Sequence, residues 1–263
     1  MVMASPHVPS GLAVSGALAW LILAAPIQAL AQAQPNTSTQ QSEHDFLSHR
    51  PRGAVGVRTG WQVAGANSDL FTFFEDQLTI GRSDFDALPL VLELGIDVTR
   101  RIQVLGTFDL ARAKIPSEYR DWVDDDGQPI EQEIAWERAS VGASVKFALV
   151  PRGVQVSTLG WVPRTVVPYV GAGGGAVRYS LSQSGDFVDF EDLGVFYDTY
   201  SSRGWAPMAQ VFGGVDVRLW RMLFMTADAR YQWAKADLDA DFVGFEPIDL
   251  SAFTASVGIS WVF

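Results

Sequence analysis

The chain contains no cysteine and only three histidines among its 263 residues. Without cysteine there is no disulfide bond, thiolate nucleophile or thiolate metal site. The histidines are His7, His44 and His49, and all three precede the first expected strand. The rest of the chain therefore lacks the usual general bases and nucleophile activators of enzymes. We expect no enzymatic activity, no catalytic residue, no bound metal and no cofactor.

Charged residues are few and acidic ones outnumber basic ones, and long apolar stretches are missing beyond the amino terminus. Charged residues make up 19% of the chain and the net charge is −11. Such acidity argues against nucleic-acid binding, which needs a basic face. No stretch after residue 33 is long and apolar enough for a transmembrane helix. Any membrane crossing beyond that point has to be made by β-strands.

The one long apolar stretch lies near the amino terminus and resembles a secretory signal peptide with an Ala-x-Ala cleavage site. We expect residues 1–33 to be this signal peptide, cleaved after Ala31 or Ala33. No lysine or arginine precedes Arg50, so the usual positive leader is missing and the start codon is open to revision. The alternative is an amino-terminal membrane anchor, which Pro26 disfavours.

Residues 34–52 are polar and aperiodic, so we expect them to form a flexible, disordered lead-in on the periplasmic side. From residue 53 onward, apolar residues alternate with small or polar ones, which is typical of β-strands with two different faces. Eight stretches are long enough to cross a bilayer as tilted strands of roughly 9–11 residues. They cover 54–64, 88–99, 102–112, 135–149, 165–180, 205–219, 223–234 and 250–263.

The lengths of the connections support a barrel. Those after the second and sixth stretches are short, whereas those after the first, third, fifth and seventh are long. Outer-membrane barrels have short periplasmic turns and long external loops in this alternation. The segment 150–164 does not follow the rule, because it is long on the periplasmic side.

The final stretch, LSAFTASVGISWVF, alternates strictly and ends on the aromatic residue Phe263. Three further fragments accompany it in order: PYVGAGGGAVRY from Pro168, GGVDVRL from Gly213 and TADARYQWA from Thr226. Together they resemble the small eight-stranded bacterial outer-membrane β-barrels that are loosely grouped with OmpA, OmpW and OmpX. Taken alone, the final stretch is also compatible with an edge strand of a soluble sandwich.

The resemblance implies an all-β fold, with a single eight-stranded antiparallel transmembrane β-barrel over residues 53–263. It implies a location in the outer membrane of a Gram-negative bacterium, and a monomer. The implied partners are outer-membrane lipids and lipopolysaccharide, and the barrel-insertion machinery acting through the C-terminal strand that ends in Phe263. The resemblance does not imply one function, because members of these families differ in their loops and lumens.

The face assignments place charged residues of both signs in the barrel lumen. An eight-stranded barrel has an interior only just wide enough for its own side chains, and buried charges are costly unless they are paired and hydrogen-bonded. We therefore expect an interlocked polar plug. Its members are Arg58, Glu93, Asp97, Asp109, Arg138, Lys146, Arg178, Asp216, Asp228 and Arg230.

One acidic segment, WVDDDGQPIEQE, partly matches a calcium loop. Asp124, Asp126, Gly127 and Glu133 take the third, fifth, sixth and twelfth places of that motif. Trp122 stands where the first carboxylate belongs, so we expect solvated loop residues here rather than a calcium site.

We expect a structural or surface-interaction role in the cell envelope. The main alternative is a narrow, porin-like passive channel for small solutes or cations. A soluble lipocalin-type barrel has its apolar faces inward around a ligand, but tryptophans near the expected strand ends favour a membrane. A lipid-modifying outer-membrane enzyme is disfavoured, because no histidine lies in the strands.

Overall fold

The computed structural model describes Leu47 and residues 49–124, 126–157, 160–189 and 194–263. The chain divides into two units, Met1–Gln41 and Ser42–Phe263, and all described elements belong to the second. The expected signal peptide and most of the expected lead-in lie outside the described residues. No helix among the described residues is long and apolar enough to cross a membrane.

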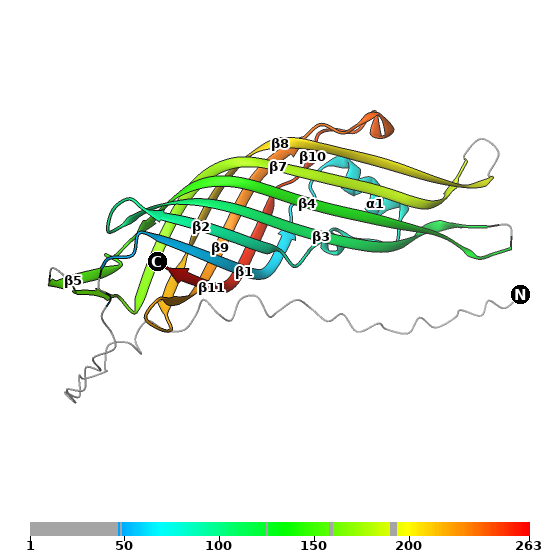
Figure 1. Ribbon diagram of the computed structural model, residues 1–263. Helices are drawn as coiled ribbons and strands as arrows, with labels where there is room; N and C mark the ends of the chain where they lie inside the picture. Colours follow the sequence, from blue (N-terminus) through cyan, green and yellow to red (C-terminus); the bar gives the residue numbers. More distant parts are fainter. Residues whose placement is uncertain (1–46, 48, 125, 158–159, 190–193) are drawn as a thin grey trace, which may run out of the picture. The chain divides into compact units, whose positions relative to one another are not determined.

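Eight antiparallel strands close into a barrel, as expected (Figure 1). Their order around the ring is β9-β11-β1-β2-β3-β4-β7-β8, and β8 pairs back with β9. The strands are β1 (Gly53–Ala64), β2 (Leu90–Asp97), β3 (Ile102–Val123), β4 (Pro129–Ala148), β7 (Val166–Val188), β8 (Val195–Arg218), β9 (Leu223–Ala236) and β11 (Ala252–Val262). Each of the eight expected stretches coincides with one of these strands.

The first and last strands form the seam of the barrel. Pairing runs without a shift from Ala54 opposite Val262 to Ala64 opposite Ala252. Phe263 continues it, because its N–H donates to the carbonyl of Gly53 at 2.9 Å and its carbonyl accepts the Gly53 N–H at 3.0 Å. The alternating final stretch therefore closes the ring and is not a free edge strand.

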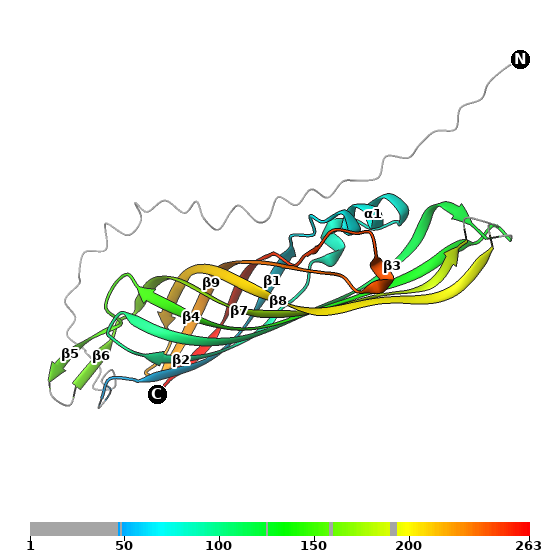
Figure 2. The ribbon, with the colours of Figure 1, turned by 90° about the horizontal axis from the view of Figure 1, so that it is seen from above.

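Four neighbouring strands are much longer than the others, which corrects the expected loops. Residues 113–123 and 129–134 extend β3 and β4, and residues 181–188 and 195–204 extend β7 and β8. Figures 1 and 2 show these strands running on together beyond the ends of the rest. We call this part the projecting sheet. Its alternation continues in buried Ile115, Ile134 and Leu181, while its outer face becomes polar.

The connections contain smaller elements that the sequence did not predict. Between β1 and β2 lie the helix α1 (Asp69–Gln77) and the 3-10 helix η2 (Arg82–Phe85). Between β9 and β11 lie the 3-10 helix η3 (Ala240–Phe242) and the short strand β10 (Ile248–Asp249), which pairs with β9. The exceptional segment after β4 forms a hairpin of β5 (Gly153–Ser157) and β6 (Gly160–Pro163).

The glycines of β7 provide space for close packing. A Cβ atom on Gly171 would lie 2.2 Å from the ring of Phe212, and one on Gly175 would lie 2.0 Å from the carbonyl oxygen of Val141. A larger residue at Gly171 would push the Phe212 ring out of the lumen. These glycines therefore let β7 approach its neighbours and leave room for an aromatic side chain inside.

Candidate functional site

The outer surface of the barrel carries a belt of exposed apolar side chains. On β11, Phe253, Val257 and Ile259 are exposed, whereas Thr254 and Ser256 point inward and are buried. Aromatic residues lie toward both ends of the belt: Trp61, Trp205, Tyr231 and Trp233 toward the projecting sheet, and Trp220, Trp261 and Phe263 toward the short turns. This is the pattern of a lipid-facing wall with interfacial aromatic girdles.

The interior of the ring is polar and the exterior is apolar, and the closed ring leaves no unpaired strand edge in lipid. The fold is that of an outer-membrane β-barrel. The soluble lipocalin-type alternative is wrong, because such a barrel turns its apolar faces inward. The short connections between β2 and β3 and between β8 and β9 mark the periplasmic end, and the projecting sheet lies at the opposite, external end.

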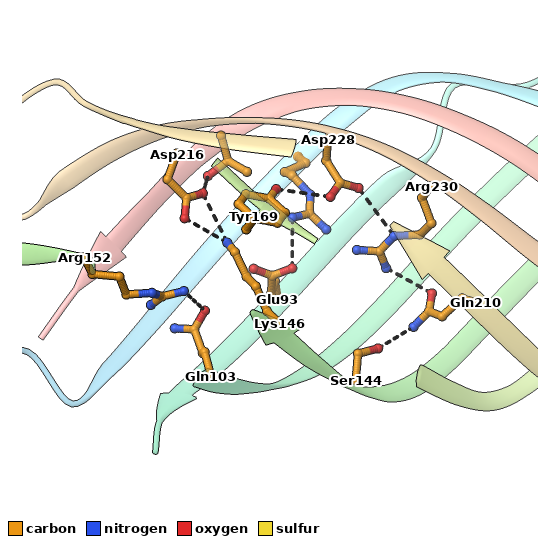
Figure 3. A network of polar contacts seen from close by, with 12 residues as sticks. Glu93, Gln103, Ser144, Lys146, Arg152, Tyr169, Gln210, Asp216, Asp228 and Arg230 are labelled. Carbon is orange, nitrogen blue, oxygen red and sulfur yellow. Dashed lines mark hydrogen bonds and ion pairs between the residues drawn. The ribbon is translucent and has the colours of Figure 1, made fainter. Parts of the chain in front are cut away.

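Ion pairs fill the lumen of this outer-membrane barrel (Figure 3). Arg58–Glu93 and Lys146–Asp216 join different strands, with N–O distances of 2.9 Å each, whereas Arg230 and Asp228 both lie on β9, 3.4 Å apart. The cationic side chains are almost fully buried, with exposed fractions of 4%, 4% and 3%. Each pair therefore removes two charges from water at once, which is tolerable only because the partners compensate each other.

Neutral polar side chains connect these pairs into one network. Arg230 donates to Gln210 at 3.2 Å, and Gln210 donates in turn to Ser144 at 2.8 Å. The Tyr169 hydroxyl donates to Asp228 at 3.1 Å, while the ammonium of Lys146 lies 3.7 Å from the centre of the Tyr169 ring. The glutamines and the tyrosine were not among the expected site residues, although their strand parity places them inward.

Nine of the ten expected lumen residues lie on the inner face of the barrel, but Arg178 does not. Its neighbours Val177 and Tyr179 are fully buried, so the side chain of Arg178 points to the outside, where it is exposed. Arg152, which was not expected, enters the lumen instead. It donates to Asp97 at 2.7 Å and to Gln103 at 2.7 Å.

The two remaining members, Asp109 and Arg138, are 1% and 2% exposed. Arg138 donates to Gln232 at 2.8 Å. The carboxylate of Asp109 has no direct hydrogen bond among the described residues.

The external end of the lumen is covered by an apolar core. The helix α1 contributes Leu70, Phe71 and Phe74, each at most 1% exposed, and they pack against the inner face of the projecting sheet. The ring of Phe71 lies 4.8 Å from that of Phe85 and 6.2 Å from that of Trp136. This core fills the space between α1 and the inner face of the projecting sheet with closely packed side chains.

The hairpin β5–β6 lies at the periplasmic end and extends away from the barrel (Figure 2). Its Trp161 is 3% exposed and exchanges two hydrogen bonds of 2.9 Å with the backbone of Leu47. Leu47, within the expected lead-in, is thus paired with β6. Arg152, Trp161 and the ion-paired lumen residues line a partly open pocket of about 50 Å³. A pocket of this size accommodates a few water molecules.

Both side edges of the projecting sheet are covered. On β8, consecutive outward N–H groups are bonded to aspartates, which prevents another strand from pairing there. The bonds run from the amides of Thr199, Ser201 and Arg203 to Asp198, Asp241 and Asp239, at 2.7, 3.0 and 2.9 Å. On β3, Thr79 and Glu118 exchange two hydrogen bonds, of 2.9 and 3.1 Å.

The residues of the partial calcium motif do not form one site. Asp124 caps the turn between β3 and β4 by accepting the N–H of Asp126 at 3.0 Å and that of Gln128 at 2.6 Å. Glu133 lies on β4 and pairs with Lys114 at 3.1 Å. Among the described residues there is no group of acids or histidines that could hold a metal ion.

No protein-family model and no curated protein matches the chain. Among solved structures it is similar to Neisserial surface protein A, with 12% identity, a TM-score of 0.43 and coverage of 80% of this chain and 96% of that chain. It is also similar to the attachment invasion locus protein Ail of Yersinia pestis, with 15% identity, a TM-score of 0.41 and coverage of 81% and 99%. A third is the outer membrane protease OmpT of Escherichia coli, with 12% identity, a TM-score of 0.40 and coverage of 83% and 98%.

Proposed function

We propose that this outer-membrane barrel is a sealed, non-enzymatic scaffold that holds the projecting sheet outside the membrane for surface interactions. The observation that carries the proposal is the filling of the lumen at two levels. An apolar core lies at the external mouth, and ion-paired side chains lie in the middle of the lumen. A barrel whose lumen is filled by so many buried side chains is better suited to presenting the projecting sheet than to transporting solutes.

The proposed lack of catalysis rests on the same residues. All three histidines precede β1, and the chain has no cysteine. The lumen carboxylates of Glu93, Asp97, Asp216 and Asp228 each lie in an ion pair, so they are held by cations rather than by one another. We expect purified protein to leave both a mixed peptide substrate set and phospholipid vesicles intact, and turnover of either would overturn this part of the proposal.

The closed edges of the projecting sheet favour contact through its faces and tip. A partner that added a strand to β8 would have to displace aspartates from Ser201 and Arg203. The tip is more accessible, because Tyr197 and Val123 are 72% and 61% exposed. The proposed partners remain outer-membrane lipids and lipopolysaccharide around the wall, and the insertion machinery at the strand ending in Phe263.

A swelling assay on liposomes tests the sealed lumen for uncharged solutes. Vesicles that contain the refolded protein are moved into isotonic glycerol or glucose, and their turbidity is followed. We expect no swelling beyond that of empty vesicles, whereas an open porin in parallel vesicles should cause rapid swelling. Swelling that scales with the amount of inserted protein would support the alternative, a narrow passive channel.

A further inference from the structure

The outer face of β3, β4, β7 and β8 changes from apolar to charged along one line. The strand register aligns three successive rows of outward residues across these strands. From the belt outward the rows are Phe108, Val141, Ala176 and Pro207, then Leu110, Ala139, Arg178 and Trp205, then Arg112, Glu137, Ser180 and Arg203. Trp205 is 64% exposed, as expected for an aromatic side chain at the interface. Trp205 therefore marks the level of the lipid headgroups on β7 and β8, where Arg178 and Arg203 lie beside it.

Two arginines at this level differ from Arg112 and Lys114 on the same sheet. Arg112 pairs with Glu137 at 2.8 Å, and Lys114 pairs with Glu133 at 3.1 Å. Arg178 and Arg203 are exposed, and neither guanidinium has an ion-pair partner among the residues that the structure describes.

The two guanidinium groups are placed to act together. Arg178 lies opposite Trp205, and Arg203 lies opposite Ser180, so the two arginines are diagonal neighbours on adjacent strands. Diagonal neighbours are about 7–8 Å apart, within reach of two long side chains that converge on one group between them. The hydroxyl of Ser180 shares that face. Guanidinium groups bind phosphate oxygens in bidentate fashion, and a hydroxyl adds a further donor.

We propose that Arg178 and Arg203, with Ser180 between them, bind a phosphate group of an anionic lipid of the outer leaflet. The lipid is the ligand because the pair lies directly above the apolar belt, where acyl chains reach the wall and headgroups begin. The inference rests on the outer-membrane placement in the proposed function and not on the sealed lumen. A negative result here would leave the swelling assay unaffected, so the two failures are distinguishable.

The test measures lipid binding to the full mature protein by native mass spectrometry in detergent. The probes are bis-phosphorylated lipid A, the same lipid after removal of both phosphates, and inorganic phosphate. The test variant is Arg178→Gln/Arg203→Gln. The matched control is Arg112→Gln/Lys114→Gln, which removes the same charge from ion-paired positions of the same sheet. Circular dichroism and the heat-dependent gel mobility of each variant report that the barrel is folded.

We expect bis-phosphorylated lipid A to bind the unmodified protein and the control with dissociation constants within about twofold of each other, and the test variant about tenfold or more weaker. Arg178→Lys/Arg203→Lys should be intermediate, because it keeps the charge and loses the bidentate geometry. Equal binding to test variant and unmodified protein, or an equal loss in the control, would overturn the proposal. Equally tight binding of the dephosphorylated lipid would rule out the phosphate, and equally tight binding of inorganic phosphate would rule out the lipid.

Discussion

In this barrel, the burial of an ion pair decides how much it contributes to the free energy of unfolding. Lys146 and Asp216 in the lumen are 4% and 13% exposed, whereas Lys114 and Glu133 on the projecting sheet are 76% and 50% exposed. The N–O distances are similar, at 2.9 and 3.1 Å. An exposed pair is screened by water and contributes little. Loss of one partner of a buried pair leaves a carboxylate without compensation.

We therefore expect Lys146→Met to lower the free energy of unfolding by about 3–5 kcal/mol, and Lys114→Met to lower it by less than about 1 kcal/mol. Adding Asp216→Asn to Lys146→Met should recover part of the loss, because it removes the uncompensated charge. Reversible urea unfolding in lipid vesicles measures all three. Equal costs for the two lysines would mean that water reaches the lumen pair freely.

The outward parity of the last strand gives a second prediction for single residues. Val257 lies on the lipid-facing side of β11 and is 50% exposed, while Val243 lies in the connection between η3 and β10 and is 83% exposed. Val257→Arg should cost about 2–4 kcal/mol near the bilayer midplane, and Val243→Arg should stay within about 0.5 kcal/mol of zero. The same unfolding assay applies, and indistinguishable values would contradict the lipid-facing assignment.

At the scale of elements, α1 is the part that closes the external mouth. Phe74 is fully buried in the apolar core, whereas the adjacent Phe73 is 43% exposed on the same helix. Phe74→Ala should cost about 3–5 kcal/mol by leaving a cavity. Phe73→Ala should cost clearly less. Limited proteolysis of residues 65–89 in the folded barrel provides the measurement, and we expect faster cleavage for Phe74→Ala alone. Equal cleavage of both variants would show that α1 is not held by its buried face.

The aspartates on the edge of β8 give a prediction about self-association. Asp239→Ala/Asp241→Ala frees the N–H groups of Arg203 and Ser201, and an uncovered strand edge tends to pair with another chain. We expect concentration-dependent dimers of this variant in detergent, measured by light scattering during size-exclusion chromatography. Asp76→Ala/Asp121→Ala removes equal charge from exposed positions and should stay monomeric. A monomeric test variant would show that the carboxylates do not protect the edge.

Strand alternation allowed the barrel to be predicted but not its closures. Parity alone placed Arg58, Lys146 and Asp228 inward, because each alternates with outward residues that are mostly apolar. It failed for Arg178, where the glycines of β7 hide which face is apolar. Parity also could not identify Arg152, because Arg152 reaches the lumen from a connection between strands. Nor could it identify the long ends of β3 and β7, where both faces of the strand change in polarity above the membrane.

The helix α1 could have been predicted from the sequence. Leu70, Phe71 and Phe74 follow a helical spacing in DLFTFFEDQ. The segment is only nine residues long, and the period-two alternation of the strands on either side of it obscures its helical spacing. Its position over the lumen depends on contacts with Trp136 and Phe85, which are distant in sequence or lie beyond a turn. Sequence periodicity carries no information about such contacts.

At the scale of the whole molecule, the proposed function has two levels of closure acting in series. The apolar core at the external end and the ion pairs in the lumen lie one below the other along the barrel. We expect the removal of one to leave the other in place.

Conductance across a planar bilayer tests this account most directly. Unmodified protein and a variant with residues 153–163 replaced by a short turn are inserted separately, and the current is recorded in 1 M salt over both polarities, with insertion verified by antibody or label. We predict no steady conductance steps for either, since α1 and the lumen pairs remain in both. Stable, reproducible steps from the unmodified protein would contradict the sealed barrel and favour the narrow channel.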